Sequence, residues 1–390
     1  MRRVAIVTGT RAEYGILKPV IEAAASSPHL EMQLLVTGMH LAPEHGYTVR
    51  EIEADGVPIA ARVEMLLRGG TMASMGKGLG LGIYGLTSEM ERLRPDIVLV
   101  LGDRVEAFAG AVAGLFTNAV VAHLHGGEIT RGGLDEYMRH AITKLSHVHF
   151  AATERAKQRI LDLGEHPGFV FRTGSPGLDA LLRYPRMSEE ALSEAIGFPL
   201  PERYALVIQH PVSTCPETAA AEITETLEAL RESGLPALLF YPNADAGGQE
   251  MAGVIQKYEK ETWLRTFLHL PRPVYANLLR RAAVLAGNSS SGMIDSAVFG
   301  IPVVNIGDRQ QGRERGDNVL DVPPERNAIA QALRQALCDA EFLQQARNAK
   351  SPYGDGQATP RILHYLESLD LKKAKEKKWL AGREEIRLPR

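Results

Sequence analysis

The sequence predicts an α/β protein made of two Rossmann-like domains that face a cleft. Three observations lead to this fold class. Short apolar runs alternate with longer helical stretches, the series restarts near residue 204, and a proline-containing connector separates the two series. Continuous apolar strands alternating with helices are typical of a parallel sheet that is covered on both faces. A length of 390 residues also favours two domains over one.

The first series contains strands that are apolar along their whole length. They are predicted at residues 4–8, 33–37, 97–101, 120–123 and 149–152, with helices such as 16–25 and 105–116 between them. The first domain is therefore predicted to span residues 1–184.

The second series repeats the pattern after a connector at residues 184–201 that contains three prolines. Its strands are predicted at residues 204–209, 237–241, 266–270, 283–286 and 303–306. The second domain is predicted at residues 185–365, followed by a helical tail at 366–390. In open α/β sheets, ligands bind beyond the carboxyl ends of the strands, so we expect the site in the cleft between the domains.

Composition and charge exclude several classes of partner. The formal net charge of -3 at pH 7 provides no overall cationic field for nucleic acid, and the lysine-rich run 372–378 is interpreted as the solvated end of a helix. Cys215 and Cys338 are the only cysteines, with no spacing typical of a metal site or a disulfide framework. No signal peptide and no apolar span of about 20 residues is recognisable. We therefore expect a cytoplasmic protein without a membrane or nucleic-acid partner.

The segment after the first strand is a candidate anion site. Residues 8–15 lack both the Gly-x-Gly-x-x-Gly fingerprint of dinucleotide-binding proteins and the Gly-Lys-Ser/Thr of a P-loop, which argues against NAD and against ATP hydrolysis. Arg11 follows the strand, where a guanidinium suits a diphosphate. The alternative is a surface residue held in a salt bridge.

Titratable side chains follow the next strands of the first domain. They are Asp103, His125, Glu128, Asp135, Glu136 and His140. Crowded carboxylates raise one another's pKa, which lets a site hold one acid and one base at neutral pH. A structural ion pair between Asp103 and Arg104 is the alternative for that position. Histidines and carboxylates also ligate metals, but no second compact cluster accompanies them, so we expect no metal.

A serine-rich turn in the second domain is the most informative segment of the chain. Ser289, Ser290 and Ser291 lie between an apolar run and an expected helix. Backbone N–H groups and hydroxyls at a helix start can bind phosphate, although serines there are often only N-caps.

Other polar groups of the second domain suit a nucleoside diphosphate. Asp295 is expected to hold the ribose diol, as acids do in other Rossmann-like sites, or else to be a first-turn acid favoured by the helix dipole. His210, at the end of a strand, completes the predicted catalytic set. The remaining predicted nucleotide contacts are Asn243, Leu270, Arg309 and Arg313.

Taken together, these segments closely resemble the hydrolysing UDP-N-acetylglucosamine 2-epimerases of bacteria. The matching segments are 9–15, 101–104, 123–128, 135–136 with 139–144, 287–292 and 307–310, within a match from about residue 3 to 365. The resemblance implies a GT-B architecture, no nicotinamide or other cofactor, and release of N-acetylmannosamine and UDP for sialic acid biosynthesis. An analogous sugar for legionaminic acid is the variant within the same family.

The resemblance also implies roles for single residues. Arg11, His210, Ser289, Ser290, Asp295 and Arg309 would contact the nucleotide, and Asp103, His125, Glu128 and Asp135 would border the sugar. His125 stands where the branch with the animal enzyme has glutamate, so the base cannot be copied from that branch. Asp295 stands where many members have glutamate, which shortens its reach to the ribose.

The expected reaction is an elimination followed by hydration. Loss of the diphosphate from C1 acidifies the C2 proton of an N-acetylhexosamine, so a cationic cradle and a carboxylate are both needed. UDP-N-acetylglucosamine is the expected substrate, with GDP-N-acetylglucosamine and UDP-2,4-diacetamido-2,4,6-trideoxyglucose as alternatives. A GT-B glycosyltransferase and a catalytically silent sugar-nucleotide sensor are rival interpretations. Apolar helices in the first domain favour a homodimer.

Overall fold

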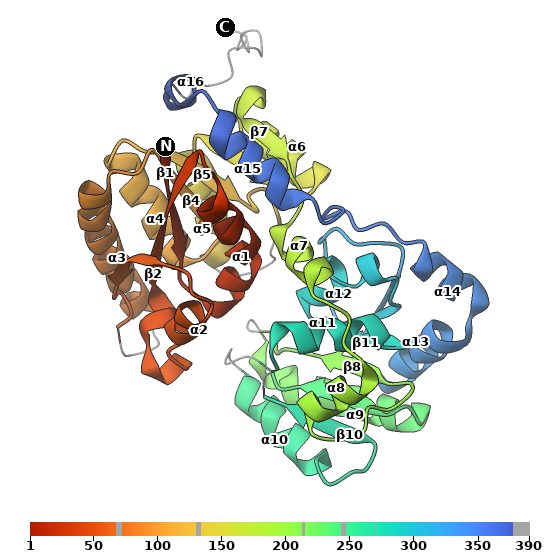
Figure 1. Ribbon diagram of the computed structural model, residues 1–390. Helices are drawn as coiled ribbons and strands as arrows, with labels where there is room; N and C mark the ends of the chain where they lie inside the picture. Colours follow the sequence, from red (N-terminus) through yellow and green to blue (C-terminus); the bar gives the residue numbers. More distant parts are fainter. Residues whose placement is uncertain (68–71, 130–133, 213–214, 243–246, 269, 377–390) are drawn as a thin grey trace, which may run out of the picture. The chain divides into compact units, whose positions relative to one another are not determined.

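The computed structural model describes residues 1–67, 72–129, 134–212, 215–242, 247–268 and 270–376 (Figure 1). Within these ranges the chain forms two compact units, and each contains one fully parallel sheet. Unit 1 is built from residues of 1–180 and of 353–376, and unit 2 from residues of 181–352. The predicted α/β class with two Rossmann-like domains is confirmed.

Unit 1 contains, among its described residues, a seven-stranded sheet of order β3-β2-β1-β4-β5-β6-β7. The strands are β1 (Arg2–Thr8), β2 (Leu30–Thr37), β3 (Ile59–Val63), β4 (Ile97–Leu101), β5 (Val120–Leu124), β6 (Val148–Ala151) and β7 (Val170–Arg172). The helices are α1 (Arg11–Ser26), α2 (Val49–Ala54), α3 (Met72–Leu93), α4 (Val105–Phe116), α5 (Leu134–Leu145), α6 (Glu154–Asp162) and α7 (Pro176–Arg183), which runs into unit 2, with short 3-10 turns at Gly38–Leu41, Pro43–His45 and Pro167–Phe169. The sequence did not predict the edge strands β3 and β7, because their short runs are not continuously apolar.

Both faces of this sheet are covered, as the uniformly apolar strands require. Val4 and Ile6 of β1 pack in one fully buried cluster with α1. Ala5 and Val7 point to the opposite face, into a second buried cluster with α3 and α4. Because alternate residues of one strand enter different clusters, both layers of helices are fixed to the same sheet.

Unit 2 contains a six-stranded sheet, again within the described residues, of order β10-β9-β8-β11-β12-β13. The strands are β8 (Ala205–Ile208), β9 (Ala237–Phe240), β10 (Leu264–Phe267), β11 (Val284–Gly287), β12 (Val303–Ile306) and β13 (Val319–Val322). The helices are α8 (Glu189–Ile196), α9 (Ala219–Ser233), α10 (Gly248–Tyr258), α11 (Arg272–Arg281), α12 (Ser290–Ile294), α13 (Arg326–Cys338) and α14 (Ala340–Arg347), with 3-10 turns at Pro216–Thr218 and Ala297–Phe299. Strand β13 was not predicted, because Asp321 interrupts its apolar run.

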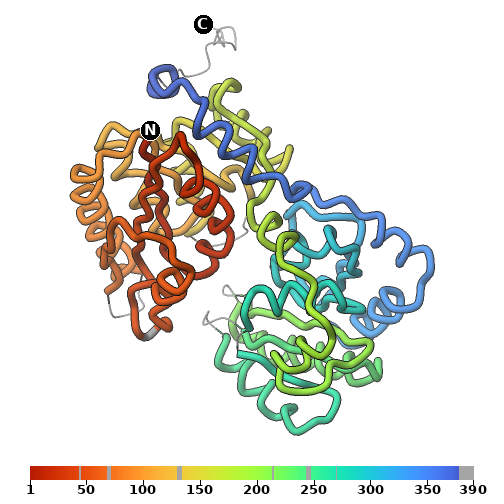
Figure 2. Tube along the Cα trace, viewed as in Figure 1, coloured from red at the N-terminus to blue at the C-terminus, as the bar shows by residue number. Residues whose placement is uncertain are grey.

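The C-terminal segment returns to unit 1 after the second sheet is complete (Figure 2). Helix α15 (Ala358–Ser368) packs on α1, and α16 (Leu371–Lys375) follows it. The Tyr365 ring stacks on Phe171 of β7 with the ring centres 3.8 Å apart. The Asp179 carboxylate accepts hydrogen bonds from the amides of Ala358 at 3.1 Å and Thr359 at 2.6 Å, which fixes the start of α15.

The unit boundary therefore falls at residue 352, whereas the sequence division placed it at 365. The apolar face of α15 identifies an amphipathic helix, but periodicity does not say which sheet that face covers. Residues 377–390 of the predicted tail lie outside the described residues. No helix among the described residues is long and apolar enough to span a membrane.

We predict that Ile362→Ala destabilises the protein, because Ile362 of α15 is fully buried in the cluster that α1 and β1 share. Removing such a side chain from a close-packed core costs about 2–5 kcal/mol. Urea unfolding followed by far-UV circular dichroism measures the loss. Ser368→Ala, an exposed position on the same helix, is the matched control, and equal stability of the two variants would contradict the role given to α15.

Candidate functional site

The carboxyl ends of β4 and β5 hold tightly constrained backbone in unit 1. Gly102, between β4 and Asp103, has a φ of 74°. His125, directly after β5, has a φ of 59°, a left-handed conformation that is uncommon outside glycine and is enriched at functional sites. A Cβ on Gly127 would lie 2.2 Å from the carbonyl oxygen of Ala156 on α6. The loop from His125 to Glu128 therefore has little freedom.

A buried guanidinium connects the predicted acids of this unit. The side chain of Arg139 on α5 is only 3% exposed and forms ion pairs with Asp103 and with Glu136, the latter at 2.6 Å. It also donates a hydrogen bond to the carbonyl oxygen of Glu128 at 2.9 Å. Arg139 thus brings together the ends of β4 and β5 and the first turn of α5.

Sequence reasoning noted Arg139 only as part of a motif and gave it no role. Its spacing of three residues from Glu136 places the two side chains on one helix face, which is the signal that could have identified the pair.

His125 and Glu128 form a second pair. His125 Nδ1 lies 2.6 Å from a Glu128 carboxylate oxygen, and both side chains are 10% exposed. The other ring nitrogen of His125 is buried and has no hydrogen-bond partner among the described residues. A carboxylate that holds one nitrogen of an imidazole fixes the ring and leaves the other nitrogen for proton transfer.

The remaining predicted groups of α5 lie nearer to solvent. Asp135 is exposed in the first turn of the helix, and His140 Nε2 lies 3.1 Å from Glu136. By contrast, His123, inside β5, is fully buried and bonds the Gly102 carbonyl at 2.7 Å. Burial lowers the pKa of His123 to about 3, so this histidine is neutral.

Two buried carboxylates flank the turn before α1, and neither was predicted as part of the site. Glu13 accepts hydrogen bonds from the amides of Gly9 at 2.8 Å and Thr10 at 2.9 Å, which completes a capping box. Burial, together with the charge of Glu106, raises the pKa of Glu13 to about 7. Glu106 pairs with Arg104 Nε at 3.4 Å, and a Cβ on Gly9 would lie 2.4 Å from Glu106 Cγ.

Arg11, which was predicted as a diphosphate ligand, is the first residue of α1 after this turn. Its Nε forms an ion pair with Glu51 of α2 at 2.7 Å, and its side chain is 35% exposed. The geometry matches the salt-bridge interpretation of Arg11 and leaves a third of the side chain accessible.

In unit 2, Asn288 connects the loops that follow β8, β11 and β12. Its side chain accepts a hydrogen bond from the His210 amide at 2.8 Å and donates one to the His210 carbonyl at 2.9 Å. Its own carbonyl oxygen accepts hydrogen bonds from Arg309 at 3.2 Å and from Gln310 at 2.9 Å. The preceding Gly287 has a φ of 122°, and a Cβ there would lie 2.1 Å from the Ile208 carbonyl oxygen. Only glycine fits this crossing.

The three serines have different surroundings. Ser289 caps α12 by accepting a hydrogen bond from the amide of Ser291 at 3.3 Å. The Ser291 hydroxyl donates to Asp295 at 2.6 Å and also contacts the hydroxyl of Tyr275. Burial raises the pKa of Asp295, although the Ser291 bond opposes the shift. Ser290 is half-buried at the first position of α12.

The other predicted nucleotide contacts of unit 2 differ from one another in burial and in hydrogen-bond partners. The Leu270 side chain is 9% exposed and packs in the hydrophobic core with Val274 and Leu278. Arg313 donates a hydrogen bond to the Gln310 side chain at 3.3 Å. Asn243 lies outside the described residues. No group of three or more His, Cys, Asp or Glu side chains is placed to hold a metal ion in the part of the chain that the structure describes.

Acids in unit 1 and a serine turn in unit 2 lie at the carboxyl ends of the strands, where open α/β sheets bind their ligands. The family model for UDP-N-acetylglucosamine 2-epimerase matches residues 22–367. The chain belongs to this family, and the resemblance inferred from its motifs is confirmed.

Individual relatives are similar to this chain over most of its length. The chain is 38% identical to UDP-N,N'-diacetylbacillosamine 2-epimerase (hydrolyzing) of Legionella pneumophila, with 95% of this chain and 97% of that protein covered. It is 32% identical to UDP-N-acetylglucosamine 2-epimerase of Neisseria meningitidis, with 88% of this chain and 89% of that protein covered. This chain is also similar to the crystal structure of UDP-GlcNAc 2-epimerase from Neisseria meningitidis bound to UDP-GlcNAc, with a TM-score of 0.82 at 19% identity. The similarity covers 93% of this chain and 99% of that chain. The expected GT-B architecture is confirmed by this likeness.

We predict that Glu13 makes folding stability depend on pH. The folded-state pKa of about 7 lies above the ordinary value of 4.5, so the folded protein binds this proton more tightly than the unfolded chain. The associated stability is present below about pH 4.5 and is lost as the pH rises towards 7. Glu13→Gln mimics the protonated carboxyl, so its stability should fall less steeply across this window in urea unfolding at a series of pH values.

Glu22→Gln is the matched control, because Glu22 is an exposed residue on the same helix. It should keep the slope of the unsubstituted protein. Identical slopes for the protein with and without Glu13→Gln would show that Glu13 does not titrate in this range.

Proposed function

We propose that this protein is a hydrolysing 2-epimerase of a UDP-linked 2-acetamido sugar. The observation that carries the proposal is the pairing of His125 with Glu128 and of Asp103 with Arg139 at neighbouring strand ends, in a chain of the 2-epimerase family. The reaction needs a base for the C2 proton and groups that return a proton to the other face of C2. The Asp103 carboxylate and the His125–Glu128 pair supply such groups, while the Arg139 guanidinium only positions Asp103.

The proposed reaction begins with departure of the diphosphate from C1. The positive charge that develops at C1 acidifies the C2 proton, and its removal gives a 2-acetamidoglucal. Water then adds at C1 while C2 is protonated from the opposite face, so the products are UDP and the free inverted sugar. Among the candidate groups, His125 has a buried ring nitrogen without a hydrogen-bond partner in the described chain, which suits it to exchange a proton at the sugar.

The nucleotide is assigned to unit 2 under this proposal. Asn288 holds His210 and Arg309 beside the serine turn, which supports their predicted contacts with the diphosphate. The Ser291 hydroxyl already donates to Asp295, so Ser290 is the better candidate to donate directly to a phosphate oxygen. Preorganised donors and cations around a leaving group are commonly the largest catalytic contribution.

The proposal also includes the identity of the sugar in the substrate. The greater identity to a UDP-N,N'-diacetylbacillosamine 2-epimerase, 38% against 32% for a UDP-N-acetylglucosamine 2-epimerase, favours a 2,4-diacetamido-2,4,6-trideoxy sugar. UDP-N-acetylglucosamine, the substrate expected from the sequence, is the second candidate because of the Neisseria meningitidis relative. Both sugars carry the acetamido group at C2 that the elimination requires.

A homodimer is the assembly that we propose. Large apolar side chains are exposed on α3, among them Met72 at 67% and Tyr84 at 76% of their surface, and Phe116 at the end of α4 is 79% exposed. Apolar surface of this kind is typical of protein–protein contacts, and α3 packs directly on α4.

We predict that incubation with nucleotide sugar and water alone yields UDP and a free sugar inverted at C2. Product NMR with UDP-N,N'-diacetylbacillosamine and with UDP-N-acetylglucosamine, supplied separately, identifies the substrate. In D2O the product should carry deuterium at C2, because the abstracted proton exchanges with solvent. A requirement for an acceptor sugar would identify a glycosyltransferase instead, and retained protium at C2 would rule out the elimination.

We predict that substitutions in the two units affect different kinetic parameters. Asp103→Asn should lower kcat by roughly 10²-fold or more, as expected for a lost acid or base, with little change in UDP affinity. Ser290→Ala should mainly weaken UDP binding, which isothermal titration measures. The assignment is wrong if Asp103→Asn abolishes UDP binding while turnover of bound substrate persists.

A further inference from the structure

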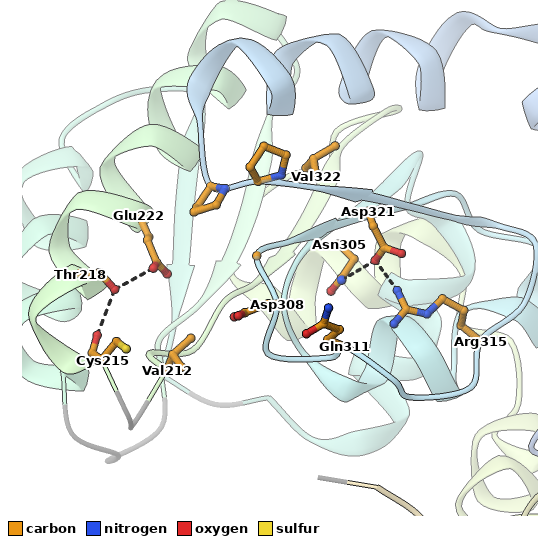
Figure 3. Close-up of a pocket in the computed structure, with 13 residues that line it drawn as sticks. Val212, Cys215, Thr218, Glu222, Asn305, Asp308, Gln311, Arg315, Asp321 and Val322 are labelled. Atoms are coloured by element: carbon orange, nitrogen blue, oxygen red, sulfur yellow. Dashed lines mark hydrogen bonds and ion pairs between the residues drawn. The ribbon is translucent and has the colours of Figure 1, made fainter. Parts of the chain in front are cut away.

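Unit 2 contains a cavity that the proposed reaction does not use. Its volume is about 670 Å³, and it lies at the carboxyl ends of β12 and β13, beside the start of α9 (Figure 3). None of the predicted catalytic or nucleotide-binding residues lines it. The volume falls in the range typical of small-molecule sites, roughly 300–1,000 Å³.

Asn305 of β12 gives this cavity an unsatisfied polar group. The residue is 2% exposed and lines the cavity, and its amide nitrogen donates to Asp321 at 2.7 Å. Its amide oxygen is buried and has no hydrogen-bond partner within the described ranges. Leaving a buried acceptor unpaired is costly, so this oxygen in the cavity wall is available to accept a hydrogen bond from a ligand.

The charged groups of the cavity are mainly carboxylates. Glu222 of α9 accepts a hydrogen bond from Thr218 at 2.7 Å with one oxygen. Asp321 is paired with Arg315, and Asp308 adds a third carboxylate from the loop after β12. Three carboxylates and one guanidinium leave two negative charges in excess.

The cavity wall also contains apolar side chains, including Val212, Val322 and the prolines that follow it. Figure 3 shows Glu222 and Asp308 on opposite sides of the open space, with Asn305 on the same side as Asp321. A compact ligand with a cationic group and several hydroxyls would match both the charge and the acceptors. An anionic ligand would meet two uncompensated carboxylates.

We propose that this cavity is a second small-molecule site, which binds an amino sugar through its ammonium and hydroxyl groups. The ammonium lies between Glu222 and Asp308, and a hydroxyl donates to the Asn305 oxygen. The residues that line this site are distinct from those assigned to sugar and nucleotide, and Asp308 precedes the proposed nucleotide contact Arg309 in the loop after β12.

Isothermal titration of the full chain tests this site with four monosaccharide probes of similar size. D-Glucosamine and D-galactosamine should bind saturably, D-glucose should bind more weakly, and D-glucuronate should not bind. The double variant Glu222→Gln/Asp308→Asn should weaken amino-sugar binding by roughly tenfold or more, because it removes both charges that pair with the ammonium. Glu225→Gln, on the same helix but paired with Arg326 outside the cavity, should bind as the unsubstituted protein does.

Three results would overturn the proposal: no saturable binding of either amino sugar, binding of glucuronate as tight as that of glucosamine, or an unchanged affinity in the double variant. The Asp103→Asn variant separates this site from the proposed sugar site of unit 1. Amino-sugar binding should survive that substitution, and its loss would place the ligand in unit 1 and refute the second site.

Discussion

The arrangement of the candidate acids depends on one buried cation, the guanidinium of Arg139. Its ion pairs with Asp103 and Glu136 and its bond to the Glu128 carbonyl join three successive elements of unit 1. A buried ion pair adds little net stability, because desolvation offsets most of the attraction, but removing one partner leaves an uncompensated charge. Arg139 therefore contributes more to the position of the acids than to the stability of the fold.

Unit 2 achieves the same kind of positioning with a neutral group. The Asn288 amide pairs with both backbone groups of His210, and its carbonyl receives Arg309 and Gln310. An amide side chain can bridge loops in this way without the desolvation cost of a charge. The two units thus position their polar loops by different means. Unit 1 has a network of ion pairs beside the candidate acids, and unit 2 has a neutral amide beside the residues that we assign to the diphosphate.

The sequence was sufficient to predict the fold class and most of the central strands, because a parallel strand covered on both faces has an unmistakable apolar run. Edge strands such as β3 were not predicted, because their exposed positions interrupt the apolar run. Candidate site residues were found where they directly follow a strand, as Asp103 and His125 do. Arg139, Asn288 and Glu13 were given no role, because each acts through contacts between distant segments.

Leu270, the last residue of a predicted strand, was predicted to contact the nucleotide, and its side chain packs in the core. That prediction therefore applies to the backbone of Leu270 rather than to its side chain. Which side of a loop residue faces solvent is decided by packing, and a single sequence carries no direct signal for it.

The return of α15 to the first sheet makes unit 2 an insertion within unit 1. Ile362 and Leu366 fill a core whose first strand begins at residue 2, so that core joins this strand to a helix that follows the whole of unit 2. During synthesis, unit 2 has all of its residues before unit 1 does. One side of the N-terminal sheet therefore keeps part of its apolar surface uncovered until residues 353–376 have been synthesised. In this protein the domain that starts first is the one completed last.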